Sequence, residues 1–283
     1  THGPKHHLFG YYGISAWDRR QRYHLVLETD FHDRAPARDD QATVALADMQ
    51  TGNLIPYAKT RAFNLQQGSM MHWIDVGFGE EFTYNDWEGD RLVARTVNPE
   101  TGHTRTLQAA IAAISPDRQT AMGLNFARMR MCRRVVGYAN DLYAKETVTP
   151  IPEDDGLYRI DLRTGAAQLV LPIAAVAAAA SVTGGVPIPG RGPVWFNHVV
   201  FNPTGDRLLF FCRRWGPEGR IEAAWSVKPD GTDLRCQIGY GARISHFAWL
   251  DAEHIVISTD VLGAMQFVQV TEGHSDFVPF GEG

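Results

Sequence analysis

A short pattern recurs along this chain, in which an apolar run, a polar turn and a second apolar run follow one another. The clearest copy spans Trp195 to Trp215, where the turn Asn202–Asp206 separates two runs rich in Val, Phe and Leu. Such a pattern predicts two antiparallel strands joined by a tight turn. Related copies begin at Trp17, Trp73, Ile114 and Trp249. These five hairpins of one design favour an all-β fold built from repeated sheets.

A second kind of turn, ending in glycine, follows each hairpin. The five turns are Asp48–Gly52, Asn98–Gly102, Asp161–Gly165, Lys228–Gly231 and, in a weaker form, Thr271–Gly273. Glycine readily adopts the positive backbone angle that such tight turns need. Each of these turns predicts a second strand pair, so each repeat is expected to form one four-stranded antiparallel sheet.

Four-stranded antiparallel units that recur every 40 to 60 residues or so are typical of a β-propeller. Five visible units is a low count for this fold, so we expect a complete ring of about seven blades. The chain, residues 1–283, is therefore predicted to be a single β-propeller domain that lacks a C-terminal blade.

The composition argues against two kinds of partner. The net charge is -5, with 27 Lys and Arg against 32 Asp and Glu, so the chain lacks the basic surplus that nucleic-acid binding requires. The run Ile173–Ala180 is too short to span a bilayer and predicts a short helix instead. We therefore expect no nucleic-acid partner and no membrane partner. The three cysteines lack zinc-site spacing, so no structural metal is predicted.

Common catalytic motifs are missing from the sequence. It contains no GxSxG, no HExxH, no GxxxxGK[ST] and no GxGxxG after a predicted strand. Serine hydrolases of the nucleophile-elbow type, zinc proteases and nucleotide-binding proteins therefore lose most of their support.

Polar residues instead gather at the open ends of the hairpins, away from the connecting turn. His7, Gln67 with His72, His198 and His246 each precede or begin a predicted hairpin. A single such histidine is more often a structural residue than a functional one. Histidines in the same position of four repeats, however, would meet on one face of a propeller.

One long connection, residues 130–152, adds basic and aromatic side chains to this set. Arg134 and Tyr138 lie within it, and Arg128 lies just before it. Long loops on a rigid scaffold commonly carry function. A solvated or packed loop is the alternative for each of these residues.

Taken together, these residues resemble the β-propeller polysaccharide lyases, which include ulvan lyases and, more distantly, oligogalacturonate lyases. The resemblance covers nearly the whole chain, although each motif is short. The motifs are His6-His7-x-Phe-Gly-Tyr-Tyr, Gln66-Gln67-Gly68 with Trp73, Tyr84-Asn85-Asp86, Phe126-Ala127-Arg128 with Gly137-Tyr138, Asn197-His198 with Phe201-Asn-Pro, and Ser245-His246-Phe-x-Trp249.

The resemblance implies cleavage of a uronic-acid-containing anionic glycan by β-elimination. A base removes the proton next to the carboxylate, positive groups neutralise that carboxylate, and an acid assists the leaving oxygen. On this basis Tyr138 and His72 are predicted as base and acid. The predicted substrate-binding residues are Arg128, Arg134, His198, His7, Gln67 and His246.

The resemblance also bears on cofactor and location. The chain's own motifs predict no metal site, but His198 and His246 could serve as ligands of a divalent metal. An enzyme that cleaves an anionic polysaccharide is expected to be secreted or periplasmic, and the start at Thr1 fits a mature or trimmed form.

Two other functions stay open at this point. A non-catalytic propeller that binds a glycan or a protein would use the same open ends without turnover. A glycoside hydrolase would need two carboxyl groups about 5 to 9.5 Å apart. The clustered candidates for that reaction are Asp75, Asp86 and Glu88, which more often belong to turns.

Overall fold

We analysed a computed structural model of the chain, which describes residues 1–143, 147–182 and 192–281. These residues divide into two compact units. The first unit comprises residues 1–114, 118–147 and 160–167, and the second comprises residues 115–117, 148–159 and 168–283.

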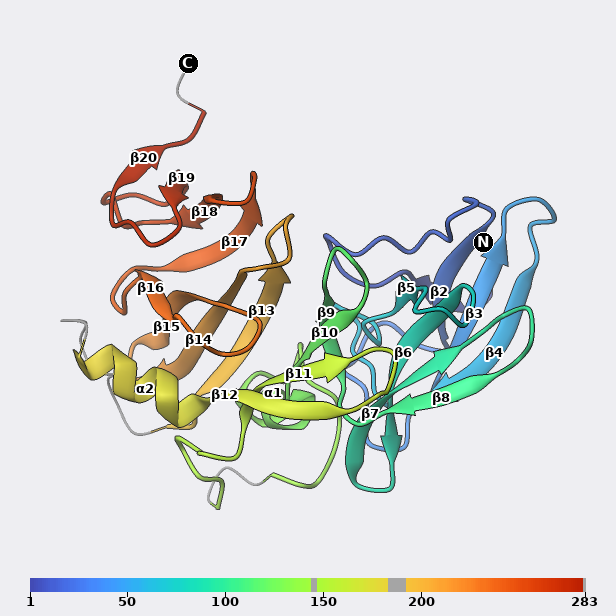
Figure 1. The fold of residues 1–283 in the computed structure, drawn as a ribbon. Helices are drawn as coiled ribbons and strands as arrows, with labels where there is room; N and C mark the ends of the chain where they lie inside the picture. The colour runs from blue at the N-terminus through green and yellow to red at the C-terminus, as the bar shows by residue number, and fades with distance from the viewer. Residues whose placement is uncertain (144–146, 183–191, 282–283) are drawn as a thin grey trace. The chain divides into compact units, whose positions relative to one another are not determined.

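The described residues form five four-stranded sheets, in each of which strands that follow one another in the chain lie side by side. The labels in Figure 1 follow chain order. The strands of the first three sheets are β1 (His6–Leu8), β2 (Tyr23–Thr29), β3 (Ala42–Asp48) and β4 (Leu54–Thr60); β5 (His72–Ile74), β6 (Glu81–Glu88), β7 (Arg91–Val97) and β8 (Thr104–Leu107); and β9 (Ile111–Ile114), β10 (Thr120–Gly123), β11 (Gly156–Asp161) and β12 (Ala167–Pro172). The last two sheets contain β13 (Trp195–Phe201), β14 (Leu208–Gly216), β15 (Gly219–Val227) and β16 (Arg235–Ile238); and β17 (Ile244–Trp249), β18 (His254–Thr259), β19 (Gln266–Thr271) and β20 (Phe277–Pro279).

The predicted hairpins are confirmed in four of the five sheets, where the expected runs form the first two strands. The first hairpin differs from the prediction. Trp17 makes only an isolated bridge with His24, and the first strand of that sheet is β1. The predicted first run fails as a strand because Asp18 turns the chain: its Oδ1 accepts hydrogen bonds from the backbone N–H groups of Arg22 and Tyr23, both at 2.7 Å.

The predicted glycine turns also form, and each joins the last two strands of its sheet. The turn glycines have φ between 72° and 85°, the left-handed region that glycine adopts without a Cβ clash. Three of them also pack against the preceding sheet. A Cβ on Gly165 would lie 2.8 Å from the carbonyl oxygen of Thr106, and one on Gly231 would lie 2.0 Å from that of Val170. The turns therefore help to hold neighbouring sheets within a unit in place.

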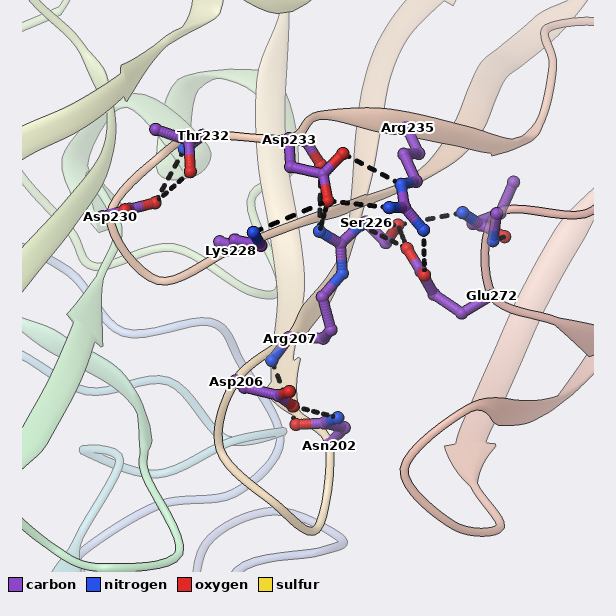
Figure 2. A network of polar contacts seen from close by, with 12 residues as sticks. Asn202, Asp206, Arg207, Ser226, Lys228, Asp230, Thr232, Asp233, Arg235 and Glu272 are labelled. Carbon is purple, nitrogen blue, oxygen red and sulfur yellow. Dashed lines mark hydrogen bonds and ion pairs between the residues drawn. The ribbon is translucent and has the colours of Figure 1, made fainter.

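A network of charged side chains also holds the last two sheets together (Figure 2). Glu272, in the turn between β19 and β20, accepts hydrogen bonds from Arg207, Ser226 and Arg235 of the fourth sheet, the last at 2.6 Å. Asp233 pairs with Arg207 at 3.1 Å and with Arg235 at 2.8 Å. Because Arg207, Ser226 and Glu272 are nearly fully buried, losing one partner would leave the others desolvated and unpaired.

The core lies between the faces of adjacent sheets. In the first unit, Leu25, Leu27 and Val44 of the first sheet cluster with Phe82 and Tyr84 of the second. In the second unit, Leu209 and Phe211 cluster with Ile255, Ile257 and Val268. Along each strand these side chains occupy alternate positions, so they lie on the face that packs against the neighbouring sheet.

Two helices interrupt the sheets in the part of the chain that the structure describes. The predicted alanine-rich helix is confirmed as α2 (Ile173–Val182). Helix α1 (Phe126–Cys132) was not predicted. Asn125 caps it, because its Oδ1 accepts a hydrogen bond from the backbone N–H of Arg128 at 3.0 Å. Neither helix is long and apolar enough to cross a membrane, as far as the described residues extend.

We predict that Gly165→Ala destabilises the protein more than Gly52→Ala. Both glycines end a turn that reads Asp-x-x-Thr-Gly, and their φ angles are 78° and 72°. Only Gly165 faces backbone within 3 Å of an added Cβ, whereas Gly52 faces open space. We expect a loss of about 1 kcal/mol for Gly52→Ala and about 2–4 kcal/mol for Gly165→Ala in urea unfolding. Equal losses would show that the turn does not support the neighbouring sheet.

Candidate functional site

The predicted histidines lie on the first strand of four of the five sheets. His7 lies on β1, His72 begins β5, His198 lies on β13 and His246 lies on β17. The pairing register shifts between Asn197 and Val200 and again between Ile244 and Phe247, so His198 and His246 both lie at β-bulges. Bulges often redirect side chains next to active sites.

His198 lies beside a buried ionic cluster of the fourth sheet. Its backbone has φ 55°, in the left-handed region, and its ring meets the edge of Phe211 at 5.5 Å between centroids. Next to it, Asn197 accepts a hydrogen bond from Arg213 at 2.7 Å, and Arg213 donates to Glu222 at 2.7 Å. Arg213 is therefore a buried structural cation, held by two acceptors, rather than an exposed group at the hairpin end.

Two other predicted histidines, His246 and His7, each lie beside a polar side chain. His246 is exposed, and its Nδ1 lies 2.9 Å from the hydroxyl of Ser245. His7 is partly buried, and its Nε2 lies 3.3 Å from a carboxylate oxygen of Glu28. Both rings are therefore oriented by a polar neighbour of the chain.

A buried asparagine organises the open end of the second sheet. The side chain of Asn85, on β6, donates to the carbonyl of Ile111 at 2.8 Å and accepts from the N–H of Ile111 at 2.7 Å. Its Nδ2 also donates to the hydroxyl of Tyr138 at 3.0 Å. The backbone carbonyl of Asn85 accepts from Ser69 at 2.8 Å and from Thr60 at 2.7 Å. One fully buried residue thus joins three sheets and two loops.

The loop that precedes β5 is closed by a second asparagine. Asn64 accepts hydrogen bonds at its Oδ1 from the N–H groups of Gln66 and Gln67, at 3.0 and 2.7 Å, and its Nδ2 donates to Val136 at 3.1 Å. This arrangement buries Gln67, which is 5% exposed. The side-chain oxygen of Gln67 nevertheless has no hydrogen-bond partner among the described residues.

His72 follows this loop and is held uncharged. Its Nε2 is covered and has no hydrogen-bond partner in the described part of the chain. Burial, with a smaller contribution from the charge of Arg118, lowers the pKa of His72 to about 4. The imidazole is therefore neutral near pH 7, with a nitrogen that is shielded from water and unused by the protein. Such a buried unsatisfied group calls for an explanation.

Tyr138 is enclosed rather than presented to a ligand. Its side chain is 0% exposed and stacks on Phe126 of α1 at 4.4 Å between ring centroids. Burial raises the pKa of its hydroxyl well above the ordinary value, although the hydrogen bond from Asn85 lowers it slightly. The phenol is therefore protonated at neutral pH, which disfavours the predicted role of Tyr138 as base.

The two predicted arginines differ in exposure. Arg128 is buried on α1, where it is 2% exposed. Arg134 is exposed, and its side chain makes no hydrogen bond or ion pair within the described residues. The loop beneath it is fixed, because Arg130 donates to the carbonyl of Arg134 at 2.9 Å and Gly137 fits closely against the backbone of Arg130.

The predicted site residues therefore divide between the two units. The first unit contains His7, Gln67, His72, Arg128, Arg134 and Tyr138, and the second contains His198 and His246. The hydrogen bonds described above connect Gln67, Tyr138 and the loop of Arg134 through Asn64 and Asn85. Whether all four histidines meet on one face stays a prediction.

The carboxylates proposed for a glycoside hydrolase are paired with arginines. Asp75 pairs with Arg19 at 3.3 Å, and Arg95 lies 3.7 Å from Asp86 and 3.3 Å from Glu88.

The described residues do not form a metal site: in residues 1–143, 147–182 and 192–281, no group of three or more His, Cys, Asp or Glu side chains is placed to hold a metal ion. His198 and His246 alone do not complete such a set.

Sequence reasoning missed the two asparagines that hold the site together. Asn85 appeared in the motif Tyr84-Asn85-Asp86 without a role, and Asn64 was not singled out. The one available signal was their position next to apolar strand residues, where a buried amide must find partners. Which partners they find depends on contacts between distant segments.

The comparisons with solved structures identify the fold. The chain is similar to an oligogalacturonate lyase solved in complex with manganese, with a TM-score of 0.60 and 15% sequence identity over 97% of this chain and 66% of the other. It is also similar to a puromycin-hydrolysing peptidase from Mycobacterium tuberculosis, with a TM-score of 0.51 and 14% identity over 96% of this chain and 39% of the other.

These neighbours are β-propeller proteins, so the chain has a β-propeller fold with five four-stranded antiparallel blades. The chain spans less than two thirds of the length of either neighbour. No protein-family model matches the chain, and no curated protein matches it. At 15% and 14% identity the likeness concerns the fold alone, and one neighbour is a lyase while the other is a peptidase.

We predict that His72 makes the protein less stable in mild acid. Its folded pKa of about 4 lies below the ordinary 6.5, so the unfolded chain binds this proton more tightly. The unfolding free energy should therefore fall as the pH drops from 6.5 towards 4, by about 1–3 kcal/mol more in the wild type than in His72→Gln. Urea unfolding at pH 7, 5.5 and 4.5 or so measures this difference.

A matched control is His103→Gln, which changes an exposed histidine in the turn between β7 and β8. It should retain the pH dependence of the wild type. If His72→Gln retains it too, then His72 is not held uncharged by burial.

Proposed function

We propose that this protein cleaves a uronic-acid-containing anionic glycan by β-elimination, with His72 as the base. The observation that carries the proposal is the covered, unpaired Nε2 of a neutral His72, next to a loop that also buries an unpaired oxygen of Gln67. A deprotonated imidazole is the form that a general base requires. A buried amide oxygen can accept a hydrogen bond from a sugar hydroxyl.

The reaction begins with the proton next to the uronate carboxylate. When the substrate displaces the groups that cover Nε2 of His72, this nitrogen takes the proton, the electrons of the broken C–H bond form a double bond in the ring, and the bond to the glycosidic oxygen breaks. The low pKa makes His72 a weak base in the free protein. A bound carboxylate raises the pKa of a nearby imidazole, so the substrate itself strengthens this base.

The leaving oxygen needs a proton, and His72 can return the one it has taken. Burial destabilises the imidazolium, which favours the transfer of its proton to the leaving oxygen. This assignment makes one residue both base and acid. It replaces the predicted division of these roles between Tyr138 and His72, because the enclosed and protonated Tyr138 serves to position the loop.

Positive charge near the substrate carboxylate is the second requirement of this chemistry. Arg134 is suited to this role, because its guanidinium is exposed and has no ion pair within the described residues. His7 and Arg128, in the same unit, remain proposed substrate contacts, and the roles of His198 and His246 stay predictions. A divalent metal has no step in this proposal, since the described side chains offer no group of three or more ligands.

The neighbours support the proposal only in that one protein of similar fold is a lyase. One is an oligogalacturonate lyase in complex with manganese, and the other is a puromycin-hydrolysing peptidase. The reaction type, the uronate substrate, a secreted or periplasmic location and the absence of nucleic-acid and membrane partners are therefore proposals for this chain.

One observation favours a second candidate, a propeller that binds an acidic glycan without cleaving it. The predicted catalytic partner Tyr138 is fully enclosed, so it does not reach a ligand in this conformation. The binding candidate would use the same loop, with Gln67 and Arg134 as contacts. Measurements of binding and turnover on the same variants separate the two functions.

We predict that the purified protein, offered ulvan, polygalacturonate and other uronate glycans, forms an unsaturated product that absorbs in the near ultraviolet. His72→Gln should lower the rate at least about 100-fold, the usual effect of removing a general base, while it leaves glycan binding within a few-fold. His103→Gln, in an exposed turn at the other end of the sheet, should retain the full rate.

Three results would decide between the candidates. Binding of the glycans with no unsaturated product supports the binding propeller and ends the lyase proposal. Neither binding nor product would end both. Turnover that survives in His72→Gln would move the reaction away from this residue.

A further inference from the structure

A pocket of about 160 Å³ lies in the first unit, apart from the side chains discussed above. Its wall includes Arg61, which follows β4, Trp87 on β6, and Arg38 in the connection between β2 and β3. Asp90 and Asp141 complete its charged groups. The volume is several times the roughly 30 Å³ that one water molecule occupies in the liquid, which suits a small organic group.

The strand register places this pocket at the open end of the first two sheets. His72 pairs with Thr83, and β6 continues from there to Glu88, which pairs with Arg91. The turn that carries Asp90 therefore lies at the end of the sheet where β5 begins. The same end of the first sheet carries the connections that contain Arg38 and Arg61. The pocket and His72 thus occupy the same end of the second sheet.

The charges of the pocket are unevenly paired. Arg38 is neutralised twice, by Asp141 at 2.5 Å and by Asp90 at 3.6 Å. Arg61 has no hydrogen bond and no ion pair in the part of the chain that the structure describes, although it is partly buried. The two arginines and two aspartates of the pocket sum to no net charge, but both aspartates contact Arg38, so Arg61 is the cation that no described carboxylate contacts.

The indole of Trp87 adds an unused donor. Trp87 is 8% exposed, and its Nε1 is covered and has no acceptor among the described residues. A buried N–H without an acceptor costs about 1–3 kcal/mol, which an acceptor from a bound molecule would recover. Trp87 lines the same pocket as Arg61, so its N–H becomes a second donor to an anion when a bound molecule displaces the atoms that cover it.

The aspartates restrict which anion fits. A phosphate dianion would meet the negative charges of Asp90 and Asp141, whose side chains are 73% and 70% exposed. A carboxylate carries a single charge and matches the planar fork of an arginine. Hydroxyl groups on the same molecule can donate to the aspartates, which only accept hydrogen bonds when ionised. A monoanion that bears several hydroxyls meets all of these conditions.

We infer that this pocket binds one uronate residue, with its carboxylate on Arg61 and Trp87 and its hydroxyls on Asp90 and Asp141. The inference rests on the proposed function for its substrate class. It adds a site to that function, because a sugar held here lies at the same end of the second sheet as His72. Arg38 then positions the two aspartates rather than contacting the carboxylate.

The test measures the binding of free glucuronate and galacturonate by calorimetry. Monomeric uronates have no glycosidic bond to break, so binding is measured without turnover. We expect Arg61→Gln to weaken binding at least 10-fold, and Trp87→Phe, which removes the N–H and keeps an aromatic ring, to weaken it several-fold. Arg20→Gln is the matched control: Arg20 is exposed in the same unit and has no ion pair within the described residues. It should bind like the wild type.

Further ligands and a folding check sharpen the outcome. Glucose, which lacks the carboxylate, and inorganic phosphate should both bind more weakly than glucuronate. Thermal melting verifies that Trp87→Phe is folded, and the partly exposed Arg61→Gln provides the decisive variant if it is not. Equal binding by Arg61→Gln and the wild type would overturn the inference, as would binding of glucose or phosphate as tight as that of glucuronate.

The two proposals fail in different ways. Uronate binding that depends on Arg61, without any turnover of glycans, supports the pocket and ends the lyase proposal. Turnover that depends on His72, without binding of monomeric uronates or any effect of Arg61→Gln on KM, supports the lyase and ends the pocket.

Discussion

The side-chain amide of Asn85 is the interaction on which the first unit depends most. It exchanges two hydrogen bonds with the backbone of Ile111 and holds the hydroxyl of Tyr138, while its own carbonyl accepts from Ser69 and Thr60. A buried amide is costly unless its groups are paired, so this set of contacts forms together or not at all. It fixes β6 against β9 and positions the loop that leads into β5 and its first residue, His72.

The sequence predicted those parts of the fold that are encoded locally. The hairpin patterns and the turn glycines specify strands and their connections over fewer than about ten residues each, which is why the order within each sheet could be predicted. The strand β1 and the helix α1 were missed for the opposite reason. Three residues, His6–Leu8, carry no periodic pattern, and Phe126–Cys132 is helical because Asn125 caps it and Tyr138 packs on it. Such short elements take their structure from tertiary contacts.

The residue types of the candidate site and their positions in the chain could be predicted, but their burial and protonation could not. The repeat predicted that His72, His198 and His246 precede or begin the hairpins, and the structure places them on first strands. Burial separates them: Nε2 of His72 is covered and burial lowers the pKa of its ring, whereas His246 is exposed beside Ser245. Burial also turned Tyr138 from a proposed base into a packed side chain. Arg61 and Trp87 carried no sequence signal at all, because their unmatched charge and unused N–H arise only where two sheets and a loop enclose a pocket.

The low pKa of His72 connects the architecture of this site to its proposed chemistry. A shift from 6.5 to about 4 corresponds to roughly 3 kcal/mol against the charged imidazole. That energy opposes proton abstraction, but it favours the return of the proton to the leaving oxygen by the same amount. A site that uses one histidine for both steps needs a pKa that permits both the uptake and the release of the proton. The carboxylate of a bound uronate would raise the pKa of His72 towards such a value, since a nearby negative charge stabilises the imidazolium. The base would then be effective only when an acidic sugar is present, so that burial of this histidine and selection of an anionic substrate are one physical property.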